Sequence, residues 1–329
     1  MKAKFLVYVL PALIFAAIHL VEAQQPKKIP RIGYVSGTGD ATNQGPYVDA
    51  LRQGLQQLGN VEGKHYMIEY RGAEGKIERV PTLVNELVEL KVDVFVAPFP
   101  PAIRATKQVT KTIPIVMVAS VDPVTTGLVE SLAHPGGNIT GISTLSQDLS
   151  GKRLELLKEV VPRLSRVGVL LDVESHSSIM NLKEYETASQ HLKVQTESLE
   201  VRGINPDLDK VFQTAAKNRV GAIVTITNAN LFLQQKRIAD LATKNRLPSM
   251  FHGSTWVDAG GLMSYSTDEL GAFRRAAVFV DKILKGTKPA DLPIEQSTKF
   301  EFVINLKTAK QIRLDIPQSV LFRADKVIK

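Results

Sequence analysis

The chain has 329 residues, which is long enough for more than one hydrophobic core. Of these residues, 44% are hydrophobic and 22% are charged, a composition typical of a globular protein. It has no cysteine, which excludes disulfides, a thiol nucleophile and cysteine-ligated metal sites. The formal net charge is +8, but lysine and arginine are interspersed with acids, and few aromatic residues accompany them. This pattern argues against a nucleic-acid partner.

The first 23 residues have the pattern of a secretory signal peptide. Two lysines precede an apolar run over residues 5–18, and Val21 and Ala23 are small residues at the expected cleavage site. A membrane anchor is the alternative, but the run is short for a span and contains Pro11. We therefore expect cleavage after Ala23 and secretion across the inner membrane into the periplasm. No lipid anchor is expected, because no cysteine follows the cleavage site.

In the first half of the chain, short apolar runs alternate with segments of helical periodicity. Strands are expected over residues 32–36, 65–70, 92–97, 115–119 and 138–143. Helices are expected over residues 47–58, 77–90, 103–110 and 126–133. Repeated strand–helix units predict a parallel sheet with helices on both faces.

The second half of the chain repeats this plan. Strands are expected over residues 167–172, 194–199, 222–226, 248–251, 260–265 and 300–305. Helices are expected over residues 150–161, 179–191, 206–217, 231–244, 268–284 and 306–312. The predicted fold class is therefore α/β, with two doubly wound parallel-sheet lobes.

Five blocks of sequence carry a family resemblance. They are ASVDPV at 119–124, AHPGGNITG at 133–141, GGLMSY at 260–265, VDKILKGTKPADLP at 280–293 and FEFVIN at 300–305. Together they resemble ABC transporter substrate-binding proteins of the periplasmic-binding-protein type I-like subfamily that includes tryptophan- and tyrosine-binding members. The resemblance spans the chain after the signal segment. One difference is His134, where family members usually have arginine.

The resemblance implies a type I periplasmic-binding fold, with three crossovers near Ser143, Ser266 and Lys288. Lobe one would comprise residues 27–143 and 267–286, and lobe two residues 144–266 and 287–329.

The function implied by the resemblance is that of an extracytoplasmic solute-binding receptor of an ABC importer. Such a receptor binds a small molecule in the interlobe cleft and delivers it to a membrane permease. The expected ligand is an amino acid or a related metabolite, aromatic ones included. We expect a monomer with no enzymatic activity, cofactor or metal.

Ligands of open α/β sheets bind at the carboxyl ends of the strands. The candidates are polar or aromatic residues in those loops: Ser36, Thr38, Asp40, Phe99, Ser120 and Asp122 in lobe one, and Asp172, Ser175, Asn228, His252, Trp256 and Tyr265 in lobe two. For an amino acid, Ser36, Thr38 and Ser120 offer hydrogen-bond donors to the carboxylate. Asp122, Asp172 or Asp258 offers a counter-charge to the ammonium. Phe99 and Trp256 offer rings that stack on a planar ligand.

Several candidates have a structural alternative. Ser120 and Asp122 are equally typical of helix caps, and Asp172 is typical of a turn. Trp256 also suits a partly buried core position, and Tyr265 suits packing at a crossover.

Other functions find less support in the sequence. Gly37-Thr38-Gly39 lacks the third glycine of a dinucleotide-binding fingerprint, and no other catalytic motif is present. The histidines lack metal-ligand spacing. A transcription regulator on this fold would begin with a helix-turn-helix, where this chain has its signal segment. The remaining alternatives are an exported α/β enzyme acting on a small metabolite and a ligand sensor subunit of a signalling system on the same fold.

Overall fold

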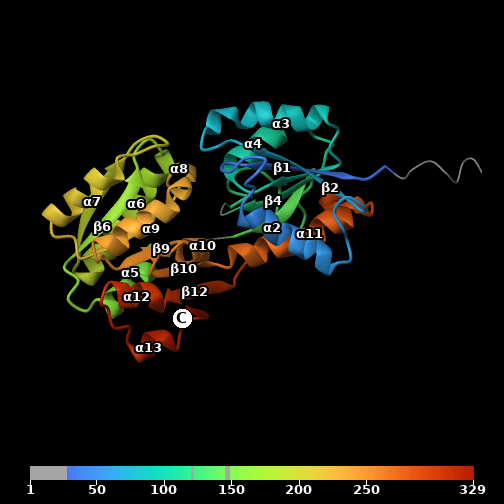
Figure 1. The fold of residues 1–329 in the computed structure, drawn as a ribbon. Helices are drawn as coiled ribbons and strands as arrows, with labels where there is room; N and C mark the ends of the chain where they lie inside the picture. The colour runs from blue at the N-terminus through green and yellow to red at the C-terminus, as the bar shows by residue number, and fades with distance from the viewer. Residues whose placement is uncertain (1–27, 120–121, 145–148) are drawn as a thin grey trace, which may run out of the picture.

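The computed structural model describes residues 28–119, 122–144 and 149–329, which form two α/β lobes side by side (Figure 1). The predicted fold class is thereby confirmed. The signal segment and Ser120 lie outside the described residues.

Lobe one contains a six-stranded parallel sheet in the order β11-β5-β4-β3-β1-β2. In chain order its strands are β1 (Arg31–Ser36), β2 (Met67–Gly72), β3 (Val94–Ala97), β4 (Ile115–Ala119), β5 (Ile139–Ser143) and β11 (Glu295–Gln296). Its helices are α2 (Pro46–Gln57), η1 (Ile77–Arg79), α3 (Val80–Glu89), α4 (Pro100–Val109), α11 (Glu269–Leu284) and η2 (Pro289–Asp291).

Side chains of the inner lobe-one strands β1, β3, β4 and β5 are buried on both faces. In β3, Val94 and Val96 pack toward α2 and α11, whereas Phe95 packs toward α3 and α4. Helices α2 and α11 lie against each other, and their contact depends on Gly54. A Cβ atom on Gly54 would lie 2.3 Å from the carbonyl oxygen of Arg274, so only glycine permits this approach.

Lobe two contains a seven-stranded sheet in the order β13-β12-β10-β9-β8-β6-β7, in which β10 and β12 form the only antiparallel pair among the described strands. Its strands are β6 (Arg166–Asp172), β7 (Gln195–Val201), β8 (Ala222–Ile226), β9 (Ser249–Phe251), β10 (Met263–Thr267), β12 (Phe300–Asn305) and β13 (Lys326–Ile328). Its helices are α5 (Ser150–Val160), α6 (His176–Leu192), α7 (Leu208–Lys217), α8 (Ala229–Leu233), α9 (Gln235–Lys244), α10 (Ser254–Asp258), α12 (Leu306–Gln311) and α13 (Gln318–Leu321).

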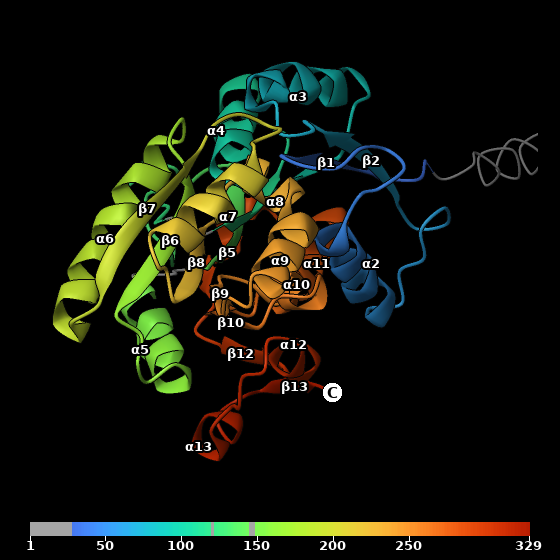
Figure 2. The same cartoon turned by 60° about the vertical axis from the view of Figure 1, so that its left-hand side comes forward.

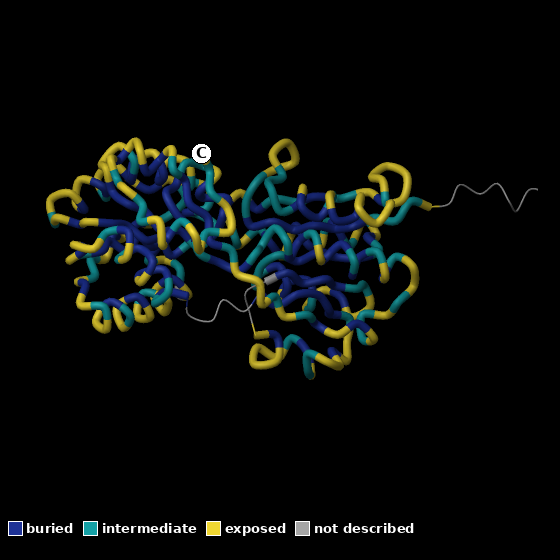
Figure 3. The backbone as a smooth tube through the Cα atoms, turned by 90° about the horizontal axis from the view of Figure 1, so that it is seen from below, coloured by how far each residue is buried: buried dark blue, intermediate teal, exposed yellow. Residues whose placement is uncertain are grey.

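Each lobe has its own hydrophobic core. In lobe two, one apolar cluster includes Leu154 of α5 and Val169 of β6, and the other includes Phe212 of α7 and Phe251 of β9. The turned view separates α5 and α6 from α7 and α9 (Figure 2). Buried residues are concentrated inside each lobe, and exposed residues follow its outer loops (Figure 3).

Three segments cross between the lobes. The first follows β5, the second joins β10 to α11, and the third joins β11 to β12. This third crossing lies at residues 297–299 and not at the predicted Lys288, so the predicted boundary of lobe one at residue 286 is too early. The reason is that β11 pairs with β5, while Leu292 and Ile294 are buried in the cores of lobe one.

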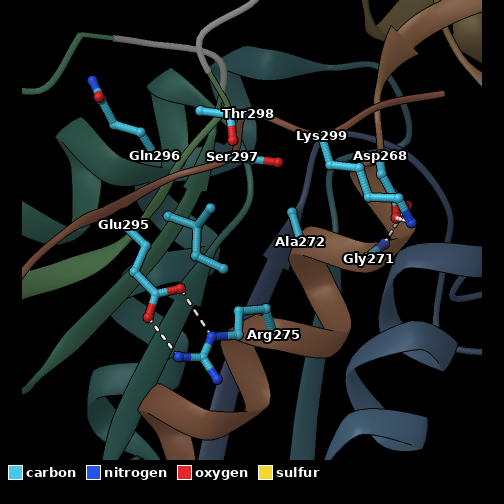
Figure 4. Close-up of a pocket in the computed structure, with 10 residues that line it drawn as sticks. Asp268, Gly271, Ala272, Arg275, Glu295, Gln296, Ser297, Thr298 and Lys299 are labelled. Atoms are coloured by element: carbon cyan, nitrogen blue, oxygen red, sulfur yellow. Dashed lines mark hydrogen bonds and ion pairs between the residues drawn. The ribbon is translucent and has the colours of Figure 1, made fainter.

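Ion pairs fix the third crossing to α11 around a small surface pocket (Figure 4). The Arg275 guanidinium donates two hydrogen bonds to the Glu295 carboxylate, at 2.8 and 2.6 Å. Asp268 caps α11 by accepting a hydrogen bond from the backbone N–H of Gly271 at 2.7 Å, and Lys299 lies 3.3 Å from the same carboxylate. The two ends of this short segment are therefore held to lobe one.

Two of the predicted elements that differ from the structure are in segments that follow strands. Residues 126–133 form turns and not a helix, because Gly127 has a φ of +67°, which a right-handed helix does not accommodate. Residues 254–258, expected as a loop, form the short helix α10. Both differences lie beside the carboxyl ends of strands.

Candidate functional site: the interlobe cleft

A cleft of about 180 Å³ lies between the lobes. It is lined by residues of both lobes: Tyr34, Ser36, Gly37, Thr38, Tyr47, Pro98, Phe99, Thr227, Asn228, Ala229, Phe232 and His252. Most of them follow β1, β3, β8 and β9, at the carboxyl ends of those strands. Helix α8 lies on the side of lobe two that faces lobe one (Figure 1). The volume is below that typical of drug-sized ligands, so the cleft suits a small metabolite.

Aromatic rings form the apolar wall of the cleft. Tyr34, Tyr47 and Phe99 come from lobe one, and Phe232 comes from α8 of lobe two. The ring centroids of Tyr47 and Phe232 lie 6.0 Å apart, which is a stacked contact between the lobes. Three of these four rings were not among the predicted site residues, because Tyr34 lies within a strand and Tyr47 and Phe232 lie on helices.

The loop after β1 brings polar groups to the cleft. The backbone N–H of Thr38 donates to Ser36 Oγ at 3.1 Å, and the Tyr70 hydroxyl donates to the Thr38 carbonyl at 2.7 Å. These bonds hold the predicted residues Ser36 and Thr38 at the cleft. Asp40 instead closes an exposed turn by accepting from the backbone N–H groups of Thr42 and Asn43, and the hydrogen bonds of Thr42 and Asn43 lower its pKa.

Asp122 closes a turn and does not cap a helix, because the residues that follow it form turns. Its exposed carboxylate accepts hydrogen bonds from the backbone N–H groups of Val124, at 2.9 Å, and Thr125, at 3.1 Å. These bonds and the Thr125 hydroxyl lower its pKa, with the hydroxyl as the largest cause. Asp258, the third predicted counter-charge, pairs with Lys326 at 3.1 Å.

Asp172 lies one layer behind the cleft and is only 1% exposed. It accepts hydrogen bonds from the side-chain amides of Asn228 at 2.8 Å and Asn230 at 2.9 Å, and from the backbone N–H of Glu174 at 3.0 Å. Asn228 lines the cleft, and its Oδ1 caps α8 by accepting from the Leu231 N–H. Asp172 therefore positions Asn228.

Three other predicted residues lie away from the cleft lining. Trp256 is fully buried in the core of lobe two, where its ring stacks on Phe251 at a centroid distance of 4.7 Å. Tyr265 stacks on Phe300 at 5.8 Å, beside the second crossing. Ser175 caps α6 by accepting from the backbone N–H of Ser178. The stacking role expected of Trp256 therefore conflicts with its burial, and Phe99 is the predicted ring that the structure brings to the cleft.

His252 is half-buried at the polar end of the cleft and faces Glu269 of lobe one. Its Nε2 lies 3.5 Å from Glu269 Oε1, and the Tyr47 hydroxyl donates to Glu269 Oε2 at 2.6 Å. Burial lowers the pKa of His252 and Arg153 adds to the effect, while Glu269 opposes it. The imidazole is therefore neutral at neutral pH, and its buried Nδ1 has no hydrogen-bond partner among the described residues. Burial, and then Glu269, raise the pKa of Tyr47 well above its usual value.

The described ranges contain no group of three histidine, aspartate or glutamate side chains arranged to hold a metal ion. Within the same ranges, no helix is both long and apolar enough to span a membrane.

Two α/β lobes that line a shared cleft with strand-end loops define the class of two-lobed small-molecule-binding proteins. Comparison with known proteins places the chain within that class. The family described as ABC transporter substrate binding protein matches residues 38–328. The chain belongs to this family, whose members are extracytoplasmic solute receptors of ABC transporters.

Individual relatives agree with this assignment. A tyrosine-binding protein of Clostridioides difficile (strain R20291) is 28% identical over 278 residues, which cover 81% of this chain and 77% of the relative. The crystal structure of an ABC domain from Streptococcus pneumoniae in complex with L-Trp has a TM-score of 0.77 at 25% identity, covering 92% of this chain and 100% of that one. A conserved domain protein of Vibrio cholerae has the same TM-score and identity, covering 91% of this chain and 100% of that one.

Proposed function

We propose that this protein is a periplasmic receptor that binds an aromatic α-amino acid in the interlobe cleft and delivers it to a membrane ABC permease. The observation that carries the proposal is the aromatic wall contributed by both lobes, with Tyr47 and Phe232 in contact across the cleft at 6.0 Å. A planar side chain stacks favourably between such rings, and the wall excludes water from it.

The relatives support this ligand class, because one of them is a tyrosine-binding protein and another is a complex with L-Trp. The proposed mechanism is closure: the ligand contacts residues of both lobes, which favours the form in which the lobes are together, and the permease binds that form. We further propose that the receptor is a monomer and that its signal segment is cleaved after Ala23. We also propose that it releases its ligand chemically unchanged.

Titration calorimetry and thermal unfolding of residues 24–329 test the ligand class. L-Tryptophan, L-tyrosine and L-phenylalanine are the test ligands, and L-leucine, L-lysine and glucose are the controls. Saturation at about 100 times Kd adds about 2.7 kcal/mol of stability, which raises the unfolding midpoint by several degrees. The proposal fails if none of the aromatic amino acids binds, or if a control ligand binds more tightly than all three.

A matched pair of variants tests the site. Phe232→Ala removes a ring from the cleft wall, whereas Phe322→Ala removes a ring that is 81% exposed and does not line the cleft. We expect Phe232→Ala to weaken aromatic amino-acid binding by about tenfold or more and Phe322→Ala to leave it unchanged. Equal affinities in the two variants would show that the ligand binds elsewhere.

Amino-terminal sequencing of the exported protein, expected to begin at Gln24, tests the cleavage site.

A further inference from the structure

Arg153 of α5 is a buried cation in lobe two. It is 9% exposed, its Nε donates to the Tyr265 carbonyl at 2.8 Å, and its Nη1 lies 3.5 Å from the Tyr185 hydroxyl. No carboxylate among the described residues lies within ion-pair distance of it. Because a buried charge is costly unless it is paired, the lack of a counter-charge among the described residues favours an anionic partner for Arg153.

The sheet of lobe two brings Arg153 and His252 together. Strands β9 and β10 are parallel, with Phe251 beside Ser264, so the next residues along the strands, His252 and Tyr265, are neighbours. Arg153 donates to the carbonyl of that same Tyr265. His252 lines the cleft, and its Nε2 lies 3.5 Å from Glu269 Oε1. The charge of Arg153 also acts on the His252 ring and lowers its pKa.

Glu269 is an acid that forms no ion pair with a lysine or arginine in the described part of the chain. Its carboxylate accepts from the neutral Tyr47 hydroxyl at 2.6 Å and lies 3.5 Å from the neutral His252 ring. No lysine or arginine among the residues described pairs with it, although residues near it do form ion pairs: Asp268 with Lys299 at 3.3 Å, and Arg275 with Glu295 at 2.6 Å. Glu269 belongs to lobe one, whereas Arg153 belongs to lobe two.

We propose that Arg153 and Glu269 form a subsite for the zwitterionic head group of an α-amino acid, with the ligand carboxylate on Arg153 and the ligand ammonium on Glu269. This inference rests on the proposed function and names the two ligand groups, the ammonium and the carboxylate, that the protein recognises. The head group supplies each side chain with a counter-charge that the described residues do not provide, and the buried Nδ1 of His252 accepts a hydrogen bond from the ammonium. The aromatic wall then holds the side chain.

Ligands that lack one charge test the subsite in the wild-type protein. They are L-tyrosine with 3-(4-hydroxyphenyl)propionate and tyramine, or L-tryptophan with indole-3-propionate and tryptamine. We expect the amino acid to bind at least about 30-fold more tightly than either analogue, because each analogue leaves one buried charge unpaired. If the amino acid binds but an analogue binds equally well, the subsite is refuted while the proposed function stands. If no aromatic amino acid binds, both fail.

Charge-removing variants assign the two halves of the subsite. Glu269→Gln should reduce the preference for the amino acid over the des-amino analogue by about tenfold or more, and leave its preference over the amine unchanged. Arg153→Gln should do the reverse, and Arg153→Lys should restore part of the preference for a carboxylate. An equal loss for all three ligands in each variant would indicate a structural role and overturn the proposal.

The controls use a surface ion pair, Glu159 with Arg323, which does not line the cleft. Glu159→Gln and Arg323→Gln remove the same charges and should leave every affinity unchanged. Should Arg153→Gln fail to fold, the wild-type ligand series and Glu269→Gln still decide the outcome.

Discussion

Closure of the lobes should depend on the absence of a side chain at Gly75. This residue lies in the loop after β2 of lobe one and has a φ of +82°. A Cβ atom there would lie 3.0 Å from both Asn230 Oδ1 and Leu233 Cδ1, two atoms of α8 in lobe two. Gly63 provides a matched control, since its φ is also +82° but nothing lies within 4 Å of its Cβ position.

The two alanine variants share one cost and differ in a second. Backbone strain at positive φ costs each about 1–2 kcal/mol of folding stability. The contact with α8 adds about 1 kcal/mol only while the lobes are together. We therefore expect Gly75→Ala to weaken ligand binding about fivefold and Gly63→Ala to leave it unchanged, with similar losses of stability in urea. Titration calorimetry with the aromatic amino acid that binds measures the affinity. Equal affinities of the two variants would refute the reasoning.

Three further predictions follow from buried groups. Trp256, stacked on Phe251, should resist acrylamide quenching in the native state and change little on L-tyrosine binding, and Trp256→Ala should cost about 3–5 kcal/mol of unfolding free energy. A strong response of its fluorescence to ligand would place the ring in the cleft. Because the folded-state pKa of His252 lies below 6.5, the unfolded chain binds the proton more readily, and stability should fall as pH drops below about 6.5. Urea titrations at several pH values should show this decline in the wild type and a smaller one in His252→Gln, and identical declines would contradict it. Asp172→Ala leaves the Asn228 amide and a second buried amide unpaired, so thermal and urea unfolding should show a loss of at least about 2 kcal/mol, and a loss near zero would contradict the positioning role.

The fold was predictable where buried strands are long enough to show in the sequence. The expected strand at residues 115–119 coincides with β4, because a continuous apolar run is what burial on both faces requires. The third crossing was not predictable, because β11 consists of only Glu295 and Gln296. Two polar residues carry no hydrophobic period, and their place in the sheet depends on the core contacts of Leu292 and Ile294.

The candidate site was predictable in part from the positions of the strand-end loops. Ser36, Thr38, Phe99, Asn228 and His252 line the cleft because strand-end loops of both sheets face it. Whether such a loop residue faces a cleft, a cap or the core depends on the local backbone, which periodicity does not specify. A polar residue there serves equally well as a cap, so a cap and a ligand contact have the same sequence pattern. The structure separates them by the hydrogen bonds that each side chain already makes.

In the proposed subsite, Arg153 and Glu269 link head-group recognition to lobe movement. Glu269 begins α11 directly after the second crossing, and Arg153 bonds to the carbonyl of Tyr265, which lies just before that crossing. Both side chains are thus attached to opposite sides of the same hinge segment. A ligand that bridges them holds the two sides in one arrangement, and contributes to closure whatever its side chain. The aromatic wall then determines which amino acid binds most tightly, because the contact between Tyr47 and Phe232 lies across the same cleft.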